Sequence, residues 1–133
     1  MSTILSDCHV THLESAIDGT RHDAGVLQST HQGRPLWVRY DLDAIRESVT
    51  PADLLSRPPT MWRYHELLPN RCMEDIVSLG EGMSPLLACP RLGESLGVPG
   101  LMVKDESQLP TGSFKARGLS MAITMAKHFG VER

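Results

Sequence analysis

The sequence predicts an α/β protein. Residues 36–42 alternate apolar and polar side chains with a period of two, which is typical of a strand with one buried face. Residues 101–129 read as a short apolar strand, a loop and an amphipathic helix, which together form the first part of a β-α-β unit. We therefore expect strands covered by helices, with a small appendage at the N-terminus.

Composition and charge narrow the range of partners. The chain has 133 residues, of which 41% are hydrophobic and 22% charged, as in ordinary soluble globular proteins. A formal net charge of -3 favours neither nucleic acid nor an anionic membrane surface. No stretch reaches the roughly 18 apolar residues that span a bilayer. The N-terminus has no signal or transit pattern, and the 3 cysteines are widely spaced, so we expect a cytoplasmic protein.

We expect three segments along the chain, at residues 1–35, 36–75 and 76–133. Residues 1–35 hold 4 of the 6 histidines and few large apolar side chains, so they are interpreted as a small appendage. The middle segment begins with the predicted strand at 36–42 and continues with short helices. The last segment holds the strand, loop and helix described above.

The middle segment carries clear helix signals. Thr50 is a suitable N-cap, Pro51 fits the first helical position, and Asp53 places a negative charge in the first turn. This helix should end at the prolines at 58 and 59, because a proline ring and its missing N–H interrupt a helix. The stretch "MWRYHELLP" (61–69) is apolar on one side and predicts another short helix.

Glycine and proline become frequent after residue 76. A strand is expected at 85–88 and a brief helix in "PRLGESLGVPG" (90–100). Leu101 to Val103 form a short apolar run between Gly100 and charged residues, which favours a buried strand over a helix.

The last helix carries the residue of most chemical interest, Lys115. Apolar side chains at spacings of three and four form one stripe, which consists of Leu119, Ala122, Ile123, Ala126 and Phe129. Lys115 precedes Leu119 by four residues and is expected to point inward with the stripe. Ser113 or Thr111 is expected to cap the helix, whereas Arg117 and Lys127 should be solvated.

The pattern alone leaves two interpretations of Lys115 open. Its aliphatic stem could cover the core while the ammonium group reaches water past the end of the helix. Alternatively, burial and the positive end of the helix could both disfavour the ammonium form. An amine of that kind is a nucleophile toward an aldehyde, which is the condition for a Schiff base.

Several motifs resemble one enzyme family. "KDESQLPTGSFKARG" (104–118) resembles the cofactor-lysine motif of the fold type II pyridoxal-phosphate enzymes, with Lys115 at the position of the Schiff-base lysine. "MWRYHELLP" and "VSLGEGMSPLL" (77–87) are similar to segments of the threonine synthase group in particular. "GRPLWVRYDL" (33–42) is similar to the segment that precedes them. The motifs occur in the right order from about residue 33 to the end.

The resemblance implies an α/β architecture like that of the tryptophan synthase beta chain, and a lyase that uses pyridoxal 5'-phosphate. The implied reaction converts O-phospho-L-homoserine and water to L-threonine and phosphate, so the implied partner is a small amino-acid substrate. Lys115 is implied as the catalytic, cofactor-binding lysine, with Phe114, Ser113 and Thr111 at further cofactor positions. Ser84 matches a substrate position where relatives commonly have threonine, although it could instead cap a turn. Full-length relatives are often dimers, which leaves a homodimer open.

Many threonine synthases begin with a zinc-ribbon-like pattern of two Cys-x-x-Cys pairs. Residues 1–35 resemble a degenerate form of this pattern. Only one of four expected thiolates, Cys8, is present, and the other positions hold Thr11, Ser29 and Gln32. A substitute ligand set would be Cys8, His12, His22 and His31. Its spacing matches no familiar site, so we expect no metal. Leu109 also replaces an asparagine that is common before Pro-Thr-Gly-Ser.

The resemblance places the phosphate-binding glycine loop, and the residue facing the pyridine nitrogen, after this helix. We therefore expect an incomplete, N-terminal part of such an enzyme that is inactive in isolation. Two alternatives remain at this stage. One is another fold type II lyase, such as a serine/threonine dehydratase or a diaminopropionate lyase, and the other is a non-catalytic remnant.

Overall fold

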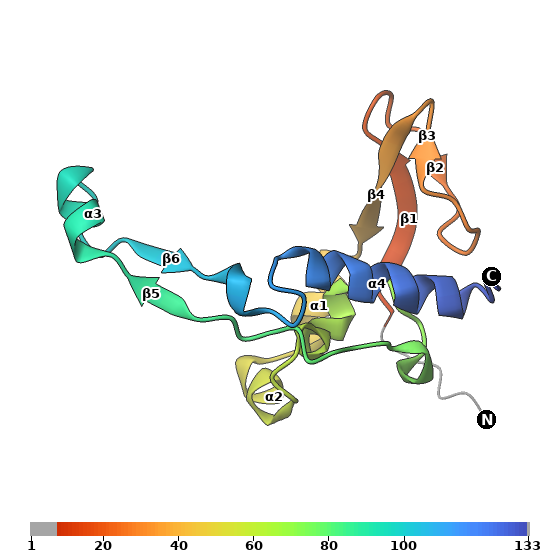
Figure 1. The fold of residues 1–133 in the computed structure, drawn as a ribbon. Helices are drawn as coiled ribbons and strands as arrows, with labels where there is room; N and C mark the ends of the chain where they lie inside the picture. The colour runs from red at the N-terminus through yellow and green to blue at the C-terminus, as the bar shows by residue number, and fades with distance from the viewer. Residues whose placement is uncertain (1–7, 133) are drawn as a thin grey trace.

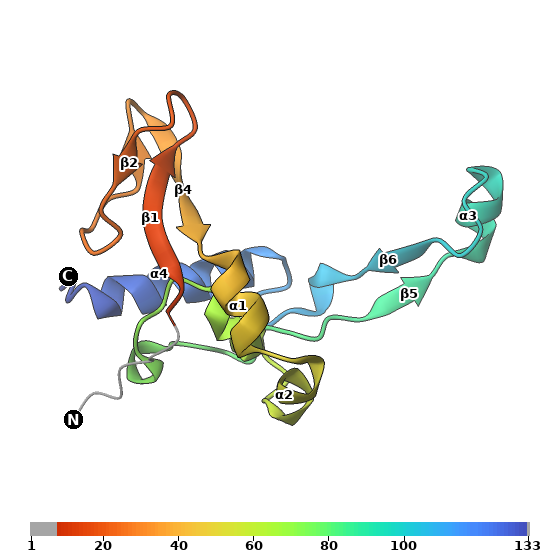
Figure 2. The same cartoon turned by 180° about the vertical axis from the view of Figure 1, so that it is seen from behind.

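The computed structural model of the protein describes residues 8–132; residues 1–7 and 133 of the expected first and last segments lie outside this range. Figures 1 and 2 show a small sheet at one end, a central group of helices, and a long arm that projects away from both. Helix α4 crosses the centre. Within the described range, no helix is both long enough and apolar enough to span a bilayer.

The sheet near the N-terminus has four strands in the order β2-β1-β4-β3, and all neighbouring strands are antiparallel. The strands are β1 (Val10–Ser15), β2 (Arg21–His22), β3 (Thr30–His31) and β4 (Arg34–Tyr40). The predicted strand at 36–42 is confirmed as β4, and its alternation is visible because Val38 is half-buried while Trp37 is exposed. Val38 lies opposite Leu13 of β1. The sheet therefore crosses the expected segment boundary at residue 35.

An ion pair and a ring contact support the exposed side of this sheet. Arg39 of β4 donates to Glu14 of β1 through both its Nε, at 3.0 Å, and one terminal nitrogen. The same guanidinium carbon lies 4.8 Å from the centre of the Trp37 ring, a distance at which a cation and an aromatic face attract each other. These contacts help to fix the register of β1 against β4.

Helices α1 (Leu42–Ser48) and α2 (Pro51–Ser56) follow the sheet, and local signals define both. The Asp41 side chain caps α1 by accepting from the Ala44 amide at 2.9 Å. In α2, Thr50 and Asp53 form a reciprocal capping box. The helix predicted at 50–58 is confirmed, and it ends just before the two prolines.

The predicted helix in "MWRYHELLP" is a 3₁₀ helix, η1 (Met61–Leu67), which is kinked at Tyr64. It buries Trp62 and Glu66. Glu66 accepts two hydrogen bonds from Arg57, at 2.8 and 2.6 Å, so this buried carboxylate is paired with a guanidinium. A single 3₁₀ turn, η2 (Met73–Asp75), follows and packs against α4.

The projecting arm consists of β5 (Leu86–Ala88), α3 (Pro90–Ser95) and β6 (Met102–Lys104). The two strands pair antiparallel, with Leu87 opposite Val103. The strands expected at 85–88 and 101–103 are thus confirmed, but the expected burial of the second is wrong, because its side chains are exposed. The physical reason is that β6 has only β5 beside it within residues 8–132 and no layer packs on either face (Figure 1).

After the short η3 turn (Glu106–Gln108), the chain enters α4 (Lys115–His128). The helix is confirmed, but the expected inward stripe is wrong for Leu119, Ala122 and Ile123, whereas Ala126 and Phe129 are half-buried. Leu119 is 53% exposed and Ile123 is 52% exposed, whereas the buried positions are Ala116, Ser120 and Thr124. Packing is decided here by hydrogen bonds from α4 to residues 77–81, which turn a neighbouring stripe of small and polar side chains inward.

The close approach of Gly82 to residues 59 and 60 can be tested by substitution. A Cβ atom at Gly82 would lie 2.6 Å from the Pro59 carbonyl oxygen and 2.6 Å from Thr60 Cα, so the backbone would have to move. We expect Gly82→Ala to lower the free energy of unfolding by about 1–3 kcal/mol, the usual cost of overpacking. Urea unfolding at equilibrium measures the change.

Gly118 provides the matched control. It lies in α4 with nothing within 4 Å of an added Cβ. Gly118→Ala should therefore raise the free energy of unfolding, by up to about 1 kcal/mol, because alanine favours a helix over glycine. Equal effects of the two substitutions would contradict the close approach at Gly82.

Candidate active site at the start of α4

The loop at 109–114 brings four of the predicted site residues together at the beginning of α4. Leu109 is buried and anchors the loop, and the Gly112 amide closes a turn on the Leu109 carbonyl at 2.7 Å. The prediction that Ser113 or Thr111 caps α4 is only partly right. Phe114 precedes the helix without a side-chain cap, but the Ser113 hydroxyl accepts from the Lys115 amide at 3.3 Å. The Thr111 hydroxyl donates to the Ser113 carbonyl at 3.5 Å.

Lys115 is exposed, so the expectation that it points inward is wrong in this structure. Its side chain follows the outward stripe of Leu119 and Ile123, because the buried face of α4 begins one residue later, at Ala116. An open hollow of about 280 Å³ is bounded by Phe114, Lys115, Gly118 and Leu119. The lysine and the aromatic ring therefore border one solvent-accessible space.

The three lysines of the chain differ in their surroundings. The Lys104 ammonium donates to the Ser84 carbonyl at 3.2 Å, and the Lys127 ammonium donates to the Glu74 carbonyl. Within residues 8–132 the Lys115 ammonium has no hydrogen-bond or ion-pair partner. Its nitrogen is consequently the one lysine nitrogen in the described part of the chain that is not already engaged.

Beneath Lys115, the buried carboxylate of Glu81 holds α4 in place. Glu81 is 1% exposed. Its Oε1 accepts from Trp62 Nε1 at 3.0 Å, from the Ser120 hydroxyl at 2.6 Å and from the Ser78 hydroxyl at 2.9 Å. Its Oε2 accepts from the Leu79 amide at 2.8 Å. Four donors from η1, the 78–79 segment and α4 thus converge on one side chain.

These donors explain the charge state of Glu81. Burial raises the pKa of its carboxyl group, but the hydrogen bonds from Ser120, Leu79 and Ser78 outweigh burial, so the pKa lies below the ordinary value of 4.5. Glu81 is therefore ionised near neutral pH. A buried carboxylate is tolerated when its lone pairs are satisfied in this way.

Two further hydrogen bonds align α4 with the segment at 77–81. The Thr124 hydroxyl, fully buried, accepts from the Val77 amide at 2.9 Å. The Ser120 hydroxyl lies 2.7 Å from the Val77 carbonyl oxygen, and its single proton can serve that oxygen or Glu81. Sequence reasoning missed this network. The available signal was the four-residue spacing of Ala116, Ser120 and Thr124, one position away from the apolar stripe.

Ser84, the predicted substrate residue, is buried on the other side of the first turn of α4. Its hydroxyl donates to Glu106 and accepts from Arg117 at 3.3 Å. Arg117 in turn donates to the two Glu106 oxygens at 2.7 and 3.0 Å. The expectation that Arg117 is solvated is therefore wrong, because this ion pair turns it toward η3. The Ser84 hydroxyl is already engaged on both sides.

The electrostatics of this cluster follow from the ion pair. The hydrogen bonds from Arg117 and then from Ser84 lower the pKa of Glu106 from its ordinary 4.5 to about 2. A second hollow, of about 200 Å³, adjoins the cluster and includes Tyr64, Lys104 and Arg117 in its lining. Two cationic side chains and one phenol thus border a space beside the loop at 82–84.

The histidines near the N-terminus do not assemble into a metal site in the described structure. The His22 and His31 rings lie 4.9 Å apart, and His31 Nε2 lies 3.4 Å from Asp18 Oδ2. His12 Nε2 lies 3.5 Å from Glu14 Oε2. Among residues 8–132, no group of three or more His, Cys, Asp or Glu side chains is arranged to hold a metal ion.

The sequence profile of the family described as "Pyridoxal-phosphate dependent enzyme" matches residues 77–131, which include Glu81, Ser120, the loop at 109–114 and Lys115. Residues 77–131 resemble this family. Its description names pyridoxal phosphate as the cofactor. The enzyme family expected from the sequence motifs is thereby confirmed.

Similar proteins extend the match toward the N-terminus. A threonine synthase of Methanocaldococcus jannaschii is 40% identical over 107 residues, which is 80% of this chain and 26% of the relative. A threonine synthase of Methanosarcina acetivorans is 38% identical over 94 residues, or 71% of this chain and 22% of the relative. One of Mycobacterium leprae is 44% identical over 69 residues, or 52% of this chain and 19% of the relative.

The expected similarity to threonine synthases is confirmed over most of the chain. The chain spans about a quarter of the length of the first two relatives, as their shares of 26% and 22% show. No solved structure matches the chain.

The Glu81 network generates a prediction about stability. Ser120→Ala removes a hydroxyl that serves a buried, ionised carboxylate and leaves Trp62 with one acceptor fewer. We expect the free energy of unfolding to fall by about 1.5–3 kcal/mol, the range for a hydrogen bond to a charged group. The control is Ser95→Ala on α3, where the exposed hydroxyl donates only to the Leu92 carbonyl. Its effect should stay within about 0.5 kcal/mol. Comparable losses in the two variants would contradict the network.

The Glu106–Arg117 pair generates a prediction about pH. Because the pKa of Glu106 is lowered in the folded chain, its stabilising contribution is complete above the ordinary value of 4.5. That contribution is lost as the pH falls toward about 2. The stability difference between the unmodified chain and Glu106→Gln should therefore shrink on acidification through this window. Urea unfolding at a series of pH values measures it. Glu94→Gln, at an exposed position on α3, serves as the control. If the difference in unfolding free energy between the unmodified chain and Glu106→Gln does not change with pH, the ion pair with Arg117 is not its source.

Proposed function

We propose that this chain provides the lysine-bearing part of a pyridoxal-phosphate-dependent lyase of the threonine synthase type, with Lys115 as the residue that bonds to the cofactor aldehyde. The observation that carries the proposal is the state of the three lysines. Lys104 and Lys127 donate to backbone carbonyls, whereas the Lys115 ammonium is unengaged within residues 8–132 and borders an open hollow.

The residues around Lys115 fit the cofactor. The hollow beside the lysine is open to solvent and one wall is the exposed ring of Phe114, which offers an apolar face to a planar heterocycle. The hydroxyls of Thr111 and Ser113 lie in the same loop, and within residues 8–132 they bond to backbone groups of Ser113 and Lys115 only. When bound, pyridoxal phosphate supplies an electron sink for negative charge at the Cα atom of an amino-acid substrate.

The chain's own residues contribute attachment and proton transfer. Lys115 Nζ would hold the cofactor at its aldehyde group, and as a free amine it would accept and return a proton at the substrate Cα. The Glu81 network fixes the position of α4, and therefore of the Lys115 backbone, through Ser120 one turn further along the helix. The Ser84 hydroxyl bonds to Glu106 and Arg117, and it thereby helps to position Arg117 in the lining of the second hollow.

The proposed substrate is an amino acid that carries a phosphate ester. The hollow beside Ser84 includes Lys104 and Arg117, and Lys104 uses one of its three N–H donors for the Ser84 carbonyl. A phosphate group suits such a lining. The relatives named threonine synthase support the complete reaction, in which O-phospho-L-homoserine and water give L-threonine and phosphate.

Covalent trapping tests the role of Lys115 without requiring turnover. The purified chain is mixed with pyridoxal phosphate, treated with borohydride and digested, and the modified lysine is identified by mass spectrometry. We expect modification at Lys115 to exceed that at Lys104 and Lys127 by at least about tenfold, because Lys104 and Lys127 donate to backbone carbonyls whereas Lys115 Nζ has no partner within residues 8–132. The chain's own lysines thus serve as internal references.

Two matched variants complete the experiment. Lys115→Arg keeps the charge and should abolish the visible absorbance of the lysine-bound cofactor, whereas Lys127→Arg should retain it. Equal labelling of all three lysines, or an absorbance band that survives Lys115→Arg, would overturn the assignment.

A further inference from the structure

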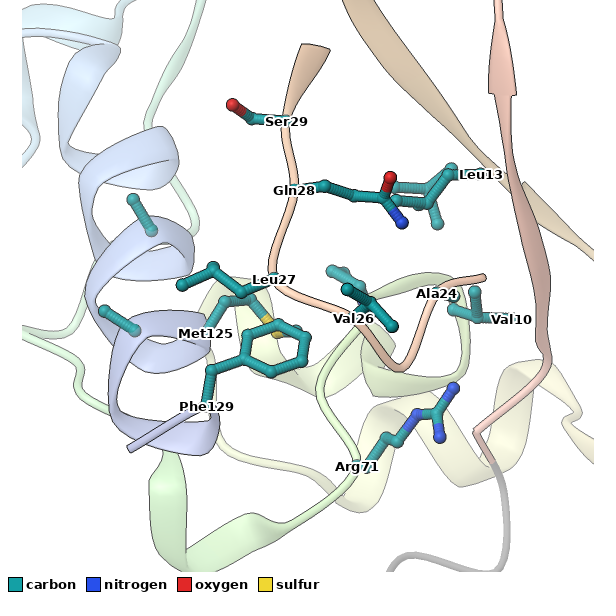
Figure 3. Close-up of a pocket in the computed structure, with 14 residues that line it drawn as sticks. Val10, Leu13, Ala24, Val26, Leu27, Gln28, Ser29, Arg71, Met125 and Phe129 are labelled. Carbon is teal, nitrogen blue, oxygen red and sulfur yellow. The ribbon is translucent and has the colours of Figure 1, made fainter. Parts of the chain in front are cut away.

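A cavity of about 330 Å³ lies between the N-terminal sheet and the C-terminal half of α4 (Figure 3). It is separate from the hollow at Lys115, which borders the first turn of the same helix. Its walls are formed by the strands β1 and β4, the irregular segment at 24–29, residues 69 and 71, and the last turns of α4. The proposed function does not use this space.

The walls of the cavity are almost entirely apolar. Leu13 and Val38, which are paired across β1 and β4, form one side, and Met125 and Phe129 of α4 form the other. Small side chains on α4, at Ala122 and Ala126, leave the space between them open. A volume of this size is at the lower end of the range of about 300–1,000 Å³ found for small-molecule sites.

Two apolar side chains at one edge of the cavity are exposed to water, which is unfavourable for apolar surface. Val26 is 54% exposed and Leu27 is 61% exposed, although both lie next to the apolar walls. Figure 3 shows Leu27 beside Met125 and Val26 between the helix and β1. An apolar ligand in the cavity would remove part of this surface from water, at a gain of about 25 cal/mol per Å².

Among residues 8–132, Arg71 is the one charged side chain that lines the cavity. Figure 3 shows its guanidinium extending toward Val10 and Ala24 at the edge of the space. Within residues 8–132 it has no hydrogen-bond or ion-pair partner. Two neighbouring side chains at this end of α4 are engaged, since Lys127 donates to the Glu74 carbonyl and His128 Nδ1 lies 2.9 Å from Asp75 Oδ2. Among the described residues, no carboxylate lines the cavity to compete for Arg71.

We propose that this cavity is a binding site for a small amphiphilic carboxylate, whose aliphatic tail lies among Leu13, Val38 and Met125 and whose head group pairs with Arg71. A guanidinium presents two parallel N–H donors that match a carboxylate, and such pairs are among the stronger hydrogen bonds in proteins. The aliphatic tail matches the apolar walls, and the carboxylate head group matches Arg71, the charged side chain at the edge of the cavity.

Three probes with the same eight-carbon tail test the proposal: octanoate, 1-octanol and octylammonium. Isothermal titration calorimetry with the full chain should rank octanoate above 1-octanol by at least about tenfold, the ratio that corresponds to one charge-assisted hydrogen bond. Octylammonium should bind more weakly than 1-octanol, because its charge would face Arg71.

Variants assign the two parts of the site. Arg71→Gln should weaken octanoate at least about tenfold and leave 1-octanol within about twofold, whereas Arg91→Gln on exposed α3 should change neither. Ala126→Leu fills the cavity and should abolish binding of both probes. Circular dichroism confirms that each variant remains folded, and Ala122→Leu replaces Ala126→Leu if the latter unfolds.

Two results would overturn the proposal. One is the absence of octanoate binding at millimolar concentration. The other is binding of octanoate and 1-octanol with equal affinity, since Arg71 would then play no part in recognition. The experiment involves neither the cofactor nor Lys115, so its failure would leave the proposed function untouched, and failure of covalent trapping would leave this site untouched.

Discussion

The buried carboxylate of Glu81 is the interaction on which the centre of the molecule depends. It receives donors from η1, from the segment at 78–79 and from α4, and these three segments are far apart in the sequence. A charge in this position is stable only while its oxygens are satisfied, so the three segments must be present together. The position of α4, with Lys115 at its start, is therefore coupled to those of Trp62 and Ser78 through Glu81.

A second ion pair extends this order to the arm. Arg117 lies on α4 and Glu106 on η3, and their contact also holds the Ser84 hydroxyl at the base of β5. The Asp105 amide bonds to the Pro85 carbonyl at 2.9 Å beside it. The arm itself has little apolar burial, so its orientation relative to α4 rests on these few polar contacts near its base. Beyond them the two strands support only each other (Figure 2).

Features that depend on neighbouring residues in the sequence could be predicted well. The capping box of Thr50 and Asp53, and the end of α2 before Pro58, follow from local hydrogen bonding and from proline geometry. The strand at 34–40 follows from its period of two. The motif around Lys115 could likewise be placed at the start of a helix, and the family it indicates was confirmed for residues 77–131.

Features that depend on what packs against an element could not be predicted in the same way. The hydrophobic pattern of α4 favoured Leu119 and Ile123 as the buried face, but the partner segment at 77–81 offers a carboxylate and backbone groups, which select Ser120 and Thr124 instead. Ser84 was expected to face a substrate, yet its burial depends on Glu106 and Arg117, which lie 22 and 33 residues away. Helical periodicity identifies candidate faces, and the chemistry of the partner decides between them.

The pairing of β4 with β1 bears on how this chain could be divided. Because β4 exchanges its backbone hydrogen bonds with β1 on one side and β3 on the other, a chain that started at residue 36 would keep most of a strand and lose both of its neighbours. Residues 10–40 thus form one structural unit, whose strands must be retained or exchanged together. Cutting the chain between these strands would remove Leu13 from beside Val38. It would thereby expose the apolar side of Val38, which forms one wall of the cavity beside α4.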